Sequence, residues 1–187
     1  MTETAGGPIE PYQHTPASCR AFDPHAGEVA ETVAALLRSR LPELQVEHVG
    51  STAIPGCAGK GIIDIMAVYP DGMLEQARAA VDSLGFQPQT FGEPFPENRP
   101  MRVGTMRLHG RRYRIHVHVI AASSEEVDAL RTFRDRGRLH QLGAVPGPAA
   151  DRVAASAASR SAQRSPASSI PTDSRRKPGA HRGASRS

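Results

Sequence analysis

The chain has 187 residues, of which 39% are hydrophobic and 22% are charged, and its formal net charge is +4. This length can hold one domain with a sizeable core, and no apolar run approaches the roughly 20 residues of a transmembrane helix, so such a helix is excluded. Two cysteines form no dense disulfide framework and no signal sequence is recognisable, so we expect a cytoplasmic protein.

The charge is divided unequally along the chain. Residues 1–136 contain 14 Lys and Arg against 17 Asp and Glu, whereas residues 137–187 contain nine against two. Because the first part is mildly acidic, we do not expect a nucleic-acid partner. From Gly137 the chain has no aromatic residue and few large aliphatic ones, so we expect a disordered basic tail over 137–187. Two origins fit this tail: a natural basic extension, or a shifted reading frame in GC-rich DNA.

The N-terminal 20 residues are polar and contain prolines, and we expect them to be flexible, with only their later part ordered. Asp23 followed by Pro24 is typical of a helix start. Apolar residues then recur on one helical face until Pro42, which predicts a core-packing helix. These apolar residues are Ala26, Val29, Ala30, Val33, Leu36 and Leu37.

The segment Glu47–Met66, EHVGSTAIPGCAGKGIIDIM, joins a glycine–serine turn to an acidic residue within an apolar strand. A short strand is predicted over Gln45–Val49. It ends at Gly50, whose missing Cβ lets Ser51 and Thr52, with their backbone amides, approach a phosphate oxygen closely. This layout is typical of a nucleotide-handling site.

The next strand, predicted over Ile62–Tyr69, is a nearly unbroken apolar run interrupted by Asp64. A lone carboxylate there carries a large desolvation cost unless a cation lies against it. Asp64 is therefore either a Mg²⁺ ligand or the partner of Lys60, Arg114 or another cationic side chain. Lys60 itself could neutralise a phosphate or be a solvated loop residue.

The middle of the chain alternates between helix and strand signals. A second helix is predicted from Asp71 to Leu84, ended by Gly85, and a further strand over Phe86–Phe91. Gly92–Pro100 contains three prolines, and a loop of this length is typical of a lid or a substrate-facing flap.

A β-hairpin is predicted from Met101–Leu108 and Tyr113–Ile120. Alternation places the aromatic and aliphatic side chains of the second strand on one face, and Arg112, Arg114, His116 and His118 on the other. The two histidines could bind one metal ion, act near a phosphate, or be hydrogen-bonded strand residues. The two arginines could form a phosphate fork or be exposed.

A last helix is predicted from the capping-box pair Ser123 and Glu126, with Val127, Leu130 and Phe133 on its apolar face. The alternation of elements predicts one α/β domain with a mixed sheet over residues 21–136.

Three quoted stretches resemble one known family: EHVGSTAIPGCAGKGIIDI, the HVHV strand at His116–Val119 and the FRD at Phe133–Asp135. The chain resembles the GrpB family of the nucleotidyltransferase superfamily. This resemblance implies a nucleotidyltransferase-like mixed sheet flanked by helices, Mg²⁺-dependent nucleotide binding, and nucleotidyl transfer to an acceptor that the sequence does not name. It also allows a non-catalytic module that binds a nucleotide or a protein, linked in some bacteria to dephospho-CoA kinase.

The site residues that the resemblance implies have three roles. The turn, Gly50, Ser51 and Thr52, would hold the terminal phosphates of a nucleoside triphosphate. Asp64 would hold the metal, and charge developing on the phosphates would be offset by Lys60 with Arg114. His116 and His118 would complete the nucleotide site.

The chain departs from the family pattern at two positions. Gly61 stands where a proline is common, and Met66 stands where the superfamily has its second carboxylate. Two bridging metal ions normally need at least two carboxylates. If Glu47, Glu93 or Glu97 reaches Asp64, catalysis is favoured; if none does, the binding module is favoured.

Overall fold

The structure is a computed structural model that describes residues 7–16 and 18–143. Within these residues, five strands form one sheet in the order β1-β2-β5-β4-β3. The strands are β1 (Gln45–Val49), β2 (Ile62–Tyr69), β3 (Gln87–Pro88), β4 (Met101–Leu108) and β5 (Arg111–Ala121). Only β2 and β5 pair in parallel, and the other neighbours are antiparallel. The predicted α/β class with a mixed sheet is confirmed.

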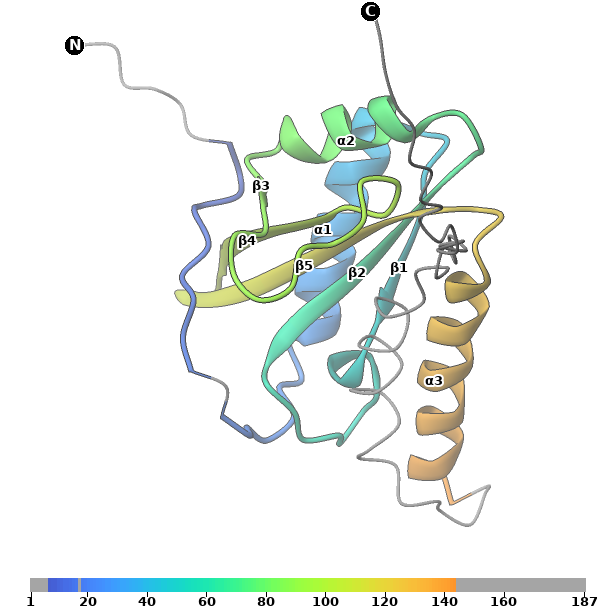
Figure 1. The fold of residues 1–187 in the computed structure, drawn as a ribbon. Coiled ribbons are helices and arrows are strands. Elements are labelled where there is room, and N and C mark those ends of the chain that lie inside the picture. The colour runs from blue at the N-terminus through green and yellow to red at the C-terminus, as the bar shows by residue number, and fades with distance from the viewer. Residues whose placement is uncertain (1–6, 17, 144–187) are drawn as a thin grey trace, which may run out of the picture.

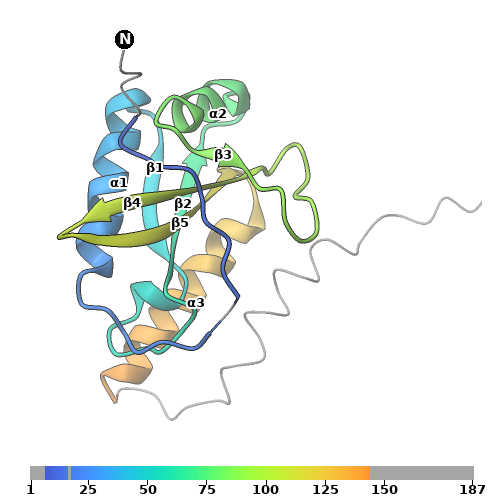
Figure 2. The same cartoon turned by 90° about the vertical axis from the view of Figure 1, so that its left-hand side faces the viewer.

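Helices cover both faces of the sheet (Figures 1 and 2). One face carries α1 (Ala26–Arg40) and α2 (Leu74–Asp82), which enclose the main core together with the inward side chains of the strands. The other face carries α3 (Glu125–Gln141), which lies beside β1 and β2. A smaller apolar cluster lies under α3 and comprises Val49, Met66, Val68, Ile120 and Val127.

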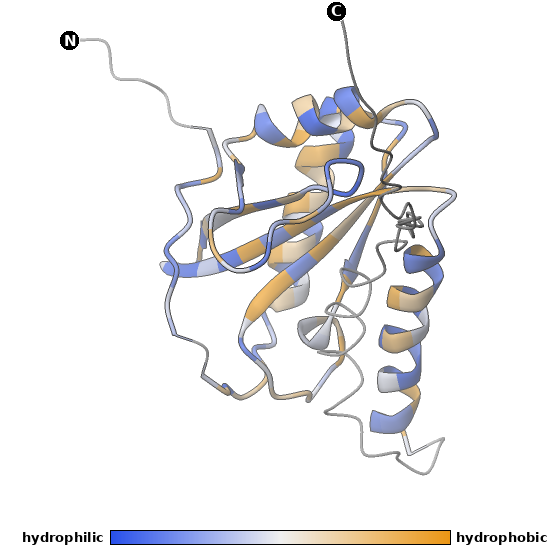
Figure 3. Ribbon diagram, viewed as in Figure 1, coloured by the Kyte–Doolittle hydropathy of each residue, from blue (hydrophilic) through white to orange (hydrophobic). Residues whose placement is uncertain are grey.

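The two helical layers differ in how they are held. Six side chains of α1 are buried, including Val29, Val33 and Leu37, each fully covered. Among the described residues of α3 only Val127 is buried, and much of this helix is coloured hydrophilic in Figure 3. Polar contacts must therefore supply much of what holds α3 to the sheet.

The helix starts differ from the predicted ones by one to three residues, and α2, predicted from Asp71 to Leu84, spans Leu74–Asp82. The first helix begins at Ala26, with His25 as N-cap. Asp23 instead makes a preceding turn, in which its carboxylate accepts a hydrogen bond from the His25 N–H at 3.0 Å. The helix ends at Arg40, ahead of Pro42 as predicted, because proline cannot continue the backbone hydrogen-bond pattern.

The N-cap of α3 is Ser124 and not the predicted Ser123. The Ser124 hydroxyl accepts a hydrogen bond from the Glu126 N–H at 3.3 Å. Its neighbour Ser123 donates to the Asp71 carboxylate at 2.8 Å, which links the helix start to the turn after β2. Two adjacent serines offer equivalent capping chemistry, and tertiary contacts decide between them.

The predicted strand Phe86–Phe91 is shorter than expected, since β3 contains only Gln87–Pro88. The β4–β5 hairpin is confirmed. Its register pairs Leu108 with Arg111, which leaves a two-residue loop of His109 and Gly110, with φ values of +49° and +72°. Positive φ at both loop positions matches the right-handed twist of the flanking strands.

The last helix continues through Gln141, past the predicted domain boundary at Arg136. Gly137 lies so close to Ile54 that a Cβ built on it would stand 2.3 Å from Ile54 Cδ1. The start of the predicted tail is thus part of the folded domain, and residues 144–187 of that tail lie outside the described residues. No helix in the described part of the chain is long and apolar enough to cross a membrane.

Candidate functional site

The candidate site begins with three side chains that share one face of the sheet. Parallel pairing of β2 and β5 places Asp64 opposite His116, and alternation puts His118 on the same face. The Asp64 Oδ1 atom lies 3.7 Å from His116 Nδ1 and 3.4 Å from His118 Nε2. All three side chains are largely covered, with exposed fractions of 27%, 13% and 15% in the order Asp64, His116, His118.

Asp64 does not pair with the cations that the sequence suggested. Arg114 donates to the Thr15 hydroxyl at 2.7 Å and to the Lys60 carbonyl at 2.9 Å, and the Lys60 side chain is exposed. Arg114 is therefore engaged in holding the N-terminal segment and the Lys60 loop, and does not form a free phosphate fork with Arg112.

His116 does not neutralise the charge of Asp64. Burial lowers the pKa of His116 to about 4, against the opposing effect of Asp64, while His118, Arg114 and Lys60 lower it further. His116 is thus uncharged at neutral pH. No Lys or Arg of the described residues pairs with Asp64, so a bound cation can balance its negative charge.

The glycine–serine turn lies directly on this carboxylate. Gly50 has φ +73°, and a Cβ built on it would stand 2.6 Å from Asp64 Oδ2. Ser51 opens a short 3₁₀ turn, η1 (Ser51–Ala53), and its hydroxyl oxygen would be 2.4 Å from a Cβ at Gly59. A Cβ at either glycine would force the Asp64 carboxylate or the Ser51 hydroxyl to move, so glycine permits both close approaches.

The two hydroxyls of the turn have different surroundings. Thr52 donates to the Ile62 carbonyl at 3.1 Å, so its oxygen accepts from His48 Nε2–H at 3.0 Å. Ser51 makes no side-chain hydrogen bond within the described residues. Of the two predicted phosphate-binding hydroxyls, Thr52 therefore fixes the turn to the start of β2, and Ser51 is available to a ligand.

Three arginines of α3 complete the site and were not recognised in the sequence. Arg131 and Arg134 bind the Glu47 carboxylate through contacts of 2.8 and 2.7 Å, and Arg138 donates to the Ala53 carbonyl at 3.0 Å. Their spacing of three and four residues places them on one helical face, which is the signal that could have identified them. They dock α3 on β1 and on the glycine–serine turn.

A second carboxylate does not reach Asp64 in the described part of the chain. Met66, at the position of the missing acid, is fully buried in the small cluster under α3. Glu47 is held by its two arginines, while Glu93 and Glu97 are exposed and make no contact with Asp64.

This donor set bears on which metal could bind. One carboxylate does not fit a two-ion catalytic centre. It does fit a single Mg²⁺ that takes its other ligands from substrate phosphates and water. Imidazoles are poor ligands for Mg²⁺, so His116 and His118 are better described as neighbours of Asp64 that orient its carboxylate.

Aromatic side chains, also missed from the sequence, border the site. Tyr12 places its hydroxyl 3.0 Å from His116 Nε2 and stacks on Phe91, with ring centroids 5.3 Å apart. Phe95 sits edge-on to His118 at 6.1 Å. Phe95 belongs to the loop Gly92–Pro100, predicted as a substrate-facing flap, and Phe91 directly precedes it, so this loop does adjoin the site. The Tyr69 hydroxyl anchors the loop by donating to its backbone at 3.0 Å.

These features define a class: an α/β domain in which a glycine–serine turn and one carboxylate meet on a mixed sheet. The chain belongs to the GrpB family, since the sequence model described as "GrpB protein" matches residues 17–143. This match ends where the described part of α3 and its C-terminal turn end, and it confirms the family resemblance seen in the sequence.

Relatives of known sequence agree with this assignment. The UPF0157 protein PA4798 of Pseudomonas aeruginosa is 36% identical over 129 residues, which are 64% of this chain and 50% of that protein. The UPF0157 protein BH1888 of Halalkalibacterium halodurans is 29% identical over 138 residues, 72% of this chain and 67% of that protein. The chain thus spans half the length of the first relative and about two thirds of the second.

The solved structures include a crystal structure of conserved protein GrpB from Enterococcus faecalis, with a TM-score of 0.52 and 25% identity over 68% of this chain and 76% of that one. Cid1 in complex with the UTP analogue UMPNPP is more distant, with a TM-score of 0.45 and 10% identity over 65% of this chain and 37% of that one. At that distance the Cid1 likeness carries no argument about activity.

Proposed function

We propose that this domain binds a nucleoside triphosphate as its Mg²⁺ complex, on the face formed by the glycine–serine turn and Asp64. One observation carries the proposal: the Asp64 carboxylate, which pairs with no Lys or Arg of the described residues, lies so close to the turn that a Cβ at Gly50 would stand 2.6 Å from its Oδ2. A phosphate placed at the turn would be repelled by Asp64 alone. A divalent ion between them removes the repulsion and uses the carboxylate as its protein ligand.

The surroundings suit the anionic part of such a ligand. The Ser51 hydroxyl and the amides of its turn supply hydrogen-bond donors. Arg134 and Arg138 act electrostatically on His48 from one side, and Lys60 and Arg114 act on His116 from the other. These cations favour a ligand with several negative charges.

The aromatic border suits the base of a nucleotide. Tyr12 and Phe91 are only partly buried, and their rings are nearly parallel, with an interplanar angle of 15°. A base can stack on such a platform with little preference for its identity. The phosphate end would then lie at the turn and the base toward the N-terminal segment.

Binding is better supported than nucleotidyl transfer. Transfer between phosphates ordinarily uses two metal ions held by at least two carboxylates, and Met66 fills the position of the second one with a buried thioether side chain. We therefore favour the non-catalytic module. A protein acceptor or an association with dephospho-CoA kinase rests on the family resemblance alone.

The test measures binding of ATP, GTP, CTP and UTP by thermal unfolding, with and without Mg²⁺. A ligand that binds the folded state raises its stability by mass action, by about 2.7 kcal/mol at a concentration 100 times the Kd. We expect stabilisation that requires Mg²⁺ and that is lost in Asp64→Asn.

Asp128→Asn is the matched control, because this α3 side chain is 88% exposed. It should bind like the parent protein. Nucleotide binding that is unaffected by Asp64→Asn would remove Asp64 from the site. Pyrophosphate release that requires both Asp64 and Mg²⁺ would show that the domain is an enzyme despite its single carboxylate.

A further inference from the structure

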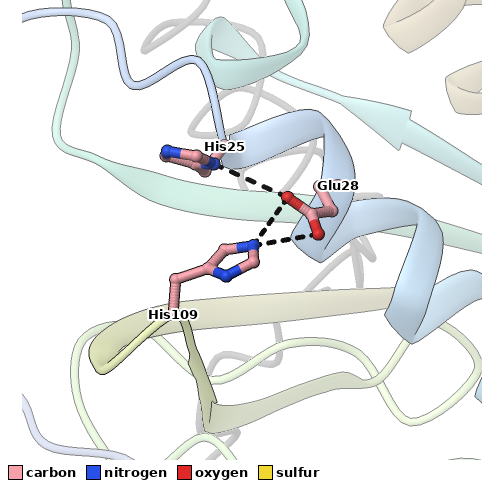
Figure 4. A group of neighbouring side chains, drawn as sticks. All are labelled: His25, Glu28 and His109. Atoms are coloured by element: carbon pink, nitrogen blue, oxygen red, sulfur yellow. Dashed lines mark hydrogen bonds and ion pairs between the residues drawn. The ribbon is translucent and has the colours of Figure 1, made fainter.

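We propose that His25, Glu28 and His109 form a zinc site that joins the start of α1 to the tip of the β4–β5 hairpin (Figure 4). This cluster is separate from the nucleotide site, since none of the three residues contacts the group around Asp64. It is the only set of three His, Cys, Asp or Glu residues in the described part of the chain whose ligand atoms all lie within 4.8 Å of one another.

The geometry already brings the donor atoms close to metal-binding distances. His109 Nε2 lies 3.0 Å from both carboxylate oxygens of Glu28, and His25 Nδ1 lies 3.5 Å from Glu28 Oε2. Donor atoms around a tetrahedral zinc ion, each at about 2.1 Å from the metal, are about 3.4 Å apart. Small side-chain rotations therefore bring the three atoms onto one ion.

The chemistry of the donors favours zinc over a harder cation. Two imidazole nitrogens and one carboxylate suit Zn²⁺, whereas Mg²⁺ and Ca²⁺ prefer oxygen ligands. The side chains are about half exposed, with fractions of 48%, 51% and 52% for His25, Glu28 and His109. Water can thus occupy the fourth ligand position.

The backbone presents these donors from fixed positions. His25 and Glu28 are three residues apart in the first turn of α1, so they share one face. His109 is the only non-glycine residue in the described chain with positive φ, at +49°. That conformation costs energy for a histidine where asparagine or glycine would be favoured. Backbone strain at a non-glycine residue is found most often at functional sites.

The neighbouring charges permit a cation. Glu28 in the first helical turn offsets the positive end of the α1 dipole. The two arginines that lie two residues from His109 along the hairpin, Arg107 and Arg111, are paired with Glu10 and Asp23 at 2.6 and 3.0 Å. A bound ion would tie together two segments that are 81 residues apart, and so would stabilise the hairpin tip against α1.

The experiment titrates Zn²⁺ into the full chain in competition with a chromophoric chelator, and follows thermal unfolding in parallel. We expect one ion to bind and the unfolding temperature to rise. His109→Gly removes a ligand yet relieves the positive φ, so this variant should fold at least as well as the parent. Its zinc affinity should fall by at least about 10-fold, and Glu28→Gln should behave alike.

His140→Ala, an exposed histidine in α3, is the matched control and should bind zinc like the parent. Unchanged zinc affinity in both His109→Gly and Glu28→Gln would overturn the proposal. Loss of zinc binding in Asp64→Asn would also overturn the proposal, because the ion would then bind at the group around Asp64. Nucleotide binding by His109→Gly is measured in the same preparation. This measurement distinguishes a failure of the zinc proposal from a failure of the proposed nucleotide binding.

Discussion

The carboxylate of Asp64 occupies the space in which any side chain at Gly50 would lie. A Cβ on Gly50 would stand 2.6 Å from Asp64 Oδ2 and 3.2 Å from its Cβ. The glycine and the aspartate are 14 positions apart, on the turn after β1 and inside β2. Their contact explains why a glycine–serine turn and a strand carboxylate belong to one site.

We expect Gly50→Ala to destabilise the protein strongly. Alanine at φ +73° and ψ −172°, a conformation that essentially only glycine adopts, costs about 1–3 kcal/mol, and displacing the Asp64 carboxylate adds about 1–3 kcal/mol. Urea unfolding of the purified variant measures the sum. Gly110→Ala is the control, because Gly110 has φ +72° with nothing within 4 Å of its Cβ position. Equal losses in the two variants would mean that the contact with Asp64 is not close.

The stability of the fold should fall as the pH drops below neutrality, in part through His48. Burial, with Arg138 and Arg134, lowers the pKa of His48 from 6.5 to about 4 despite the opposing effect of Asp64. Between these two values the unfolded chain binds a proton that the folded protein does not. The contribution of neutral His48 to the stability of the fold is therefore fully present above pH 6.5 and is lost progressively toward pH 4. At pH 5 the loss is about 2 kcal/mol.

His48→Gln tests this pH dependence, since an amide can still donate to Thr52 but does not titrate. Urea unfolding at pH 7 and pH 5 should show a smaller difference for His48→Gln than for the parent protein. His140→Gln, at an exposed position, provides the reference. If both variants lose as much stability as the parent between the two pH values, His48 is not the group responsible.

The period-two pattern of β5 was sufficient to predict that His116 and His118 share one face, because alternation fixes that geometry. That Asp64 lies on this face follows from the parallel pairing of β2 with β5, which the structure supplies. The sequence did not predict that Tyr12 contacts His116, since the two residues are 104 positions apart and no local pattern connects them. Gly137 shows a different limit. A glycine within a polar stretch is typical of a helix end, yet here it permits α3 to approach Ile54.

Truncation tests the role of the end of α3. A chain ending at Arg136 lacks the Arg138 hydrogen bond to Ala53 and the close contact of Gly137 with Ile54. We expect it to be less stable than a chain ending at Gly143 by about 1–3 kcal/mol in urea unfolding. Nucleotide binding should weaken too, because these contacts hold the glycine–serine turn. Equal stability of the two truncated chains would show that the last helical turns do not support the site.

The two hydroxyls of the turn should have separable effects. Ser51→Ala should lower the affinity for a triphosphate by about 1–3 kcal/mol and leave stability nearly unchanged, because the Ser51 hydroxyl makes no hydrogen bond within the described residues. Thr52→Ala should instead lower stability by about 1 kcal/mol, since it removes the bonds to Ile62 and His48. Thr52→Ser, which retains the hydroxyl, should recover most of that loss.

Calorimetric titration with the triphosphate and with the bare nucleoside, alongside urea unfolding, measures both effects. The Ser51→Ala loss should be larger for the triphosphate than for the nucleoside, because the turn is proposed to contact phosphate. Backbone amides remain in this variant, so binding should weaken without disappearing. Equal weakening for both ligands would mean that the turn shapes the pocket without touching phosphate. A larger binding loss in Thr52→Ala than in Ser51→Ala would reverse the roles assigned to the two hydroxyls.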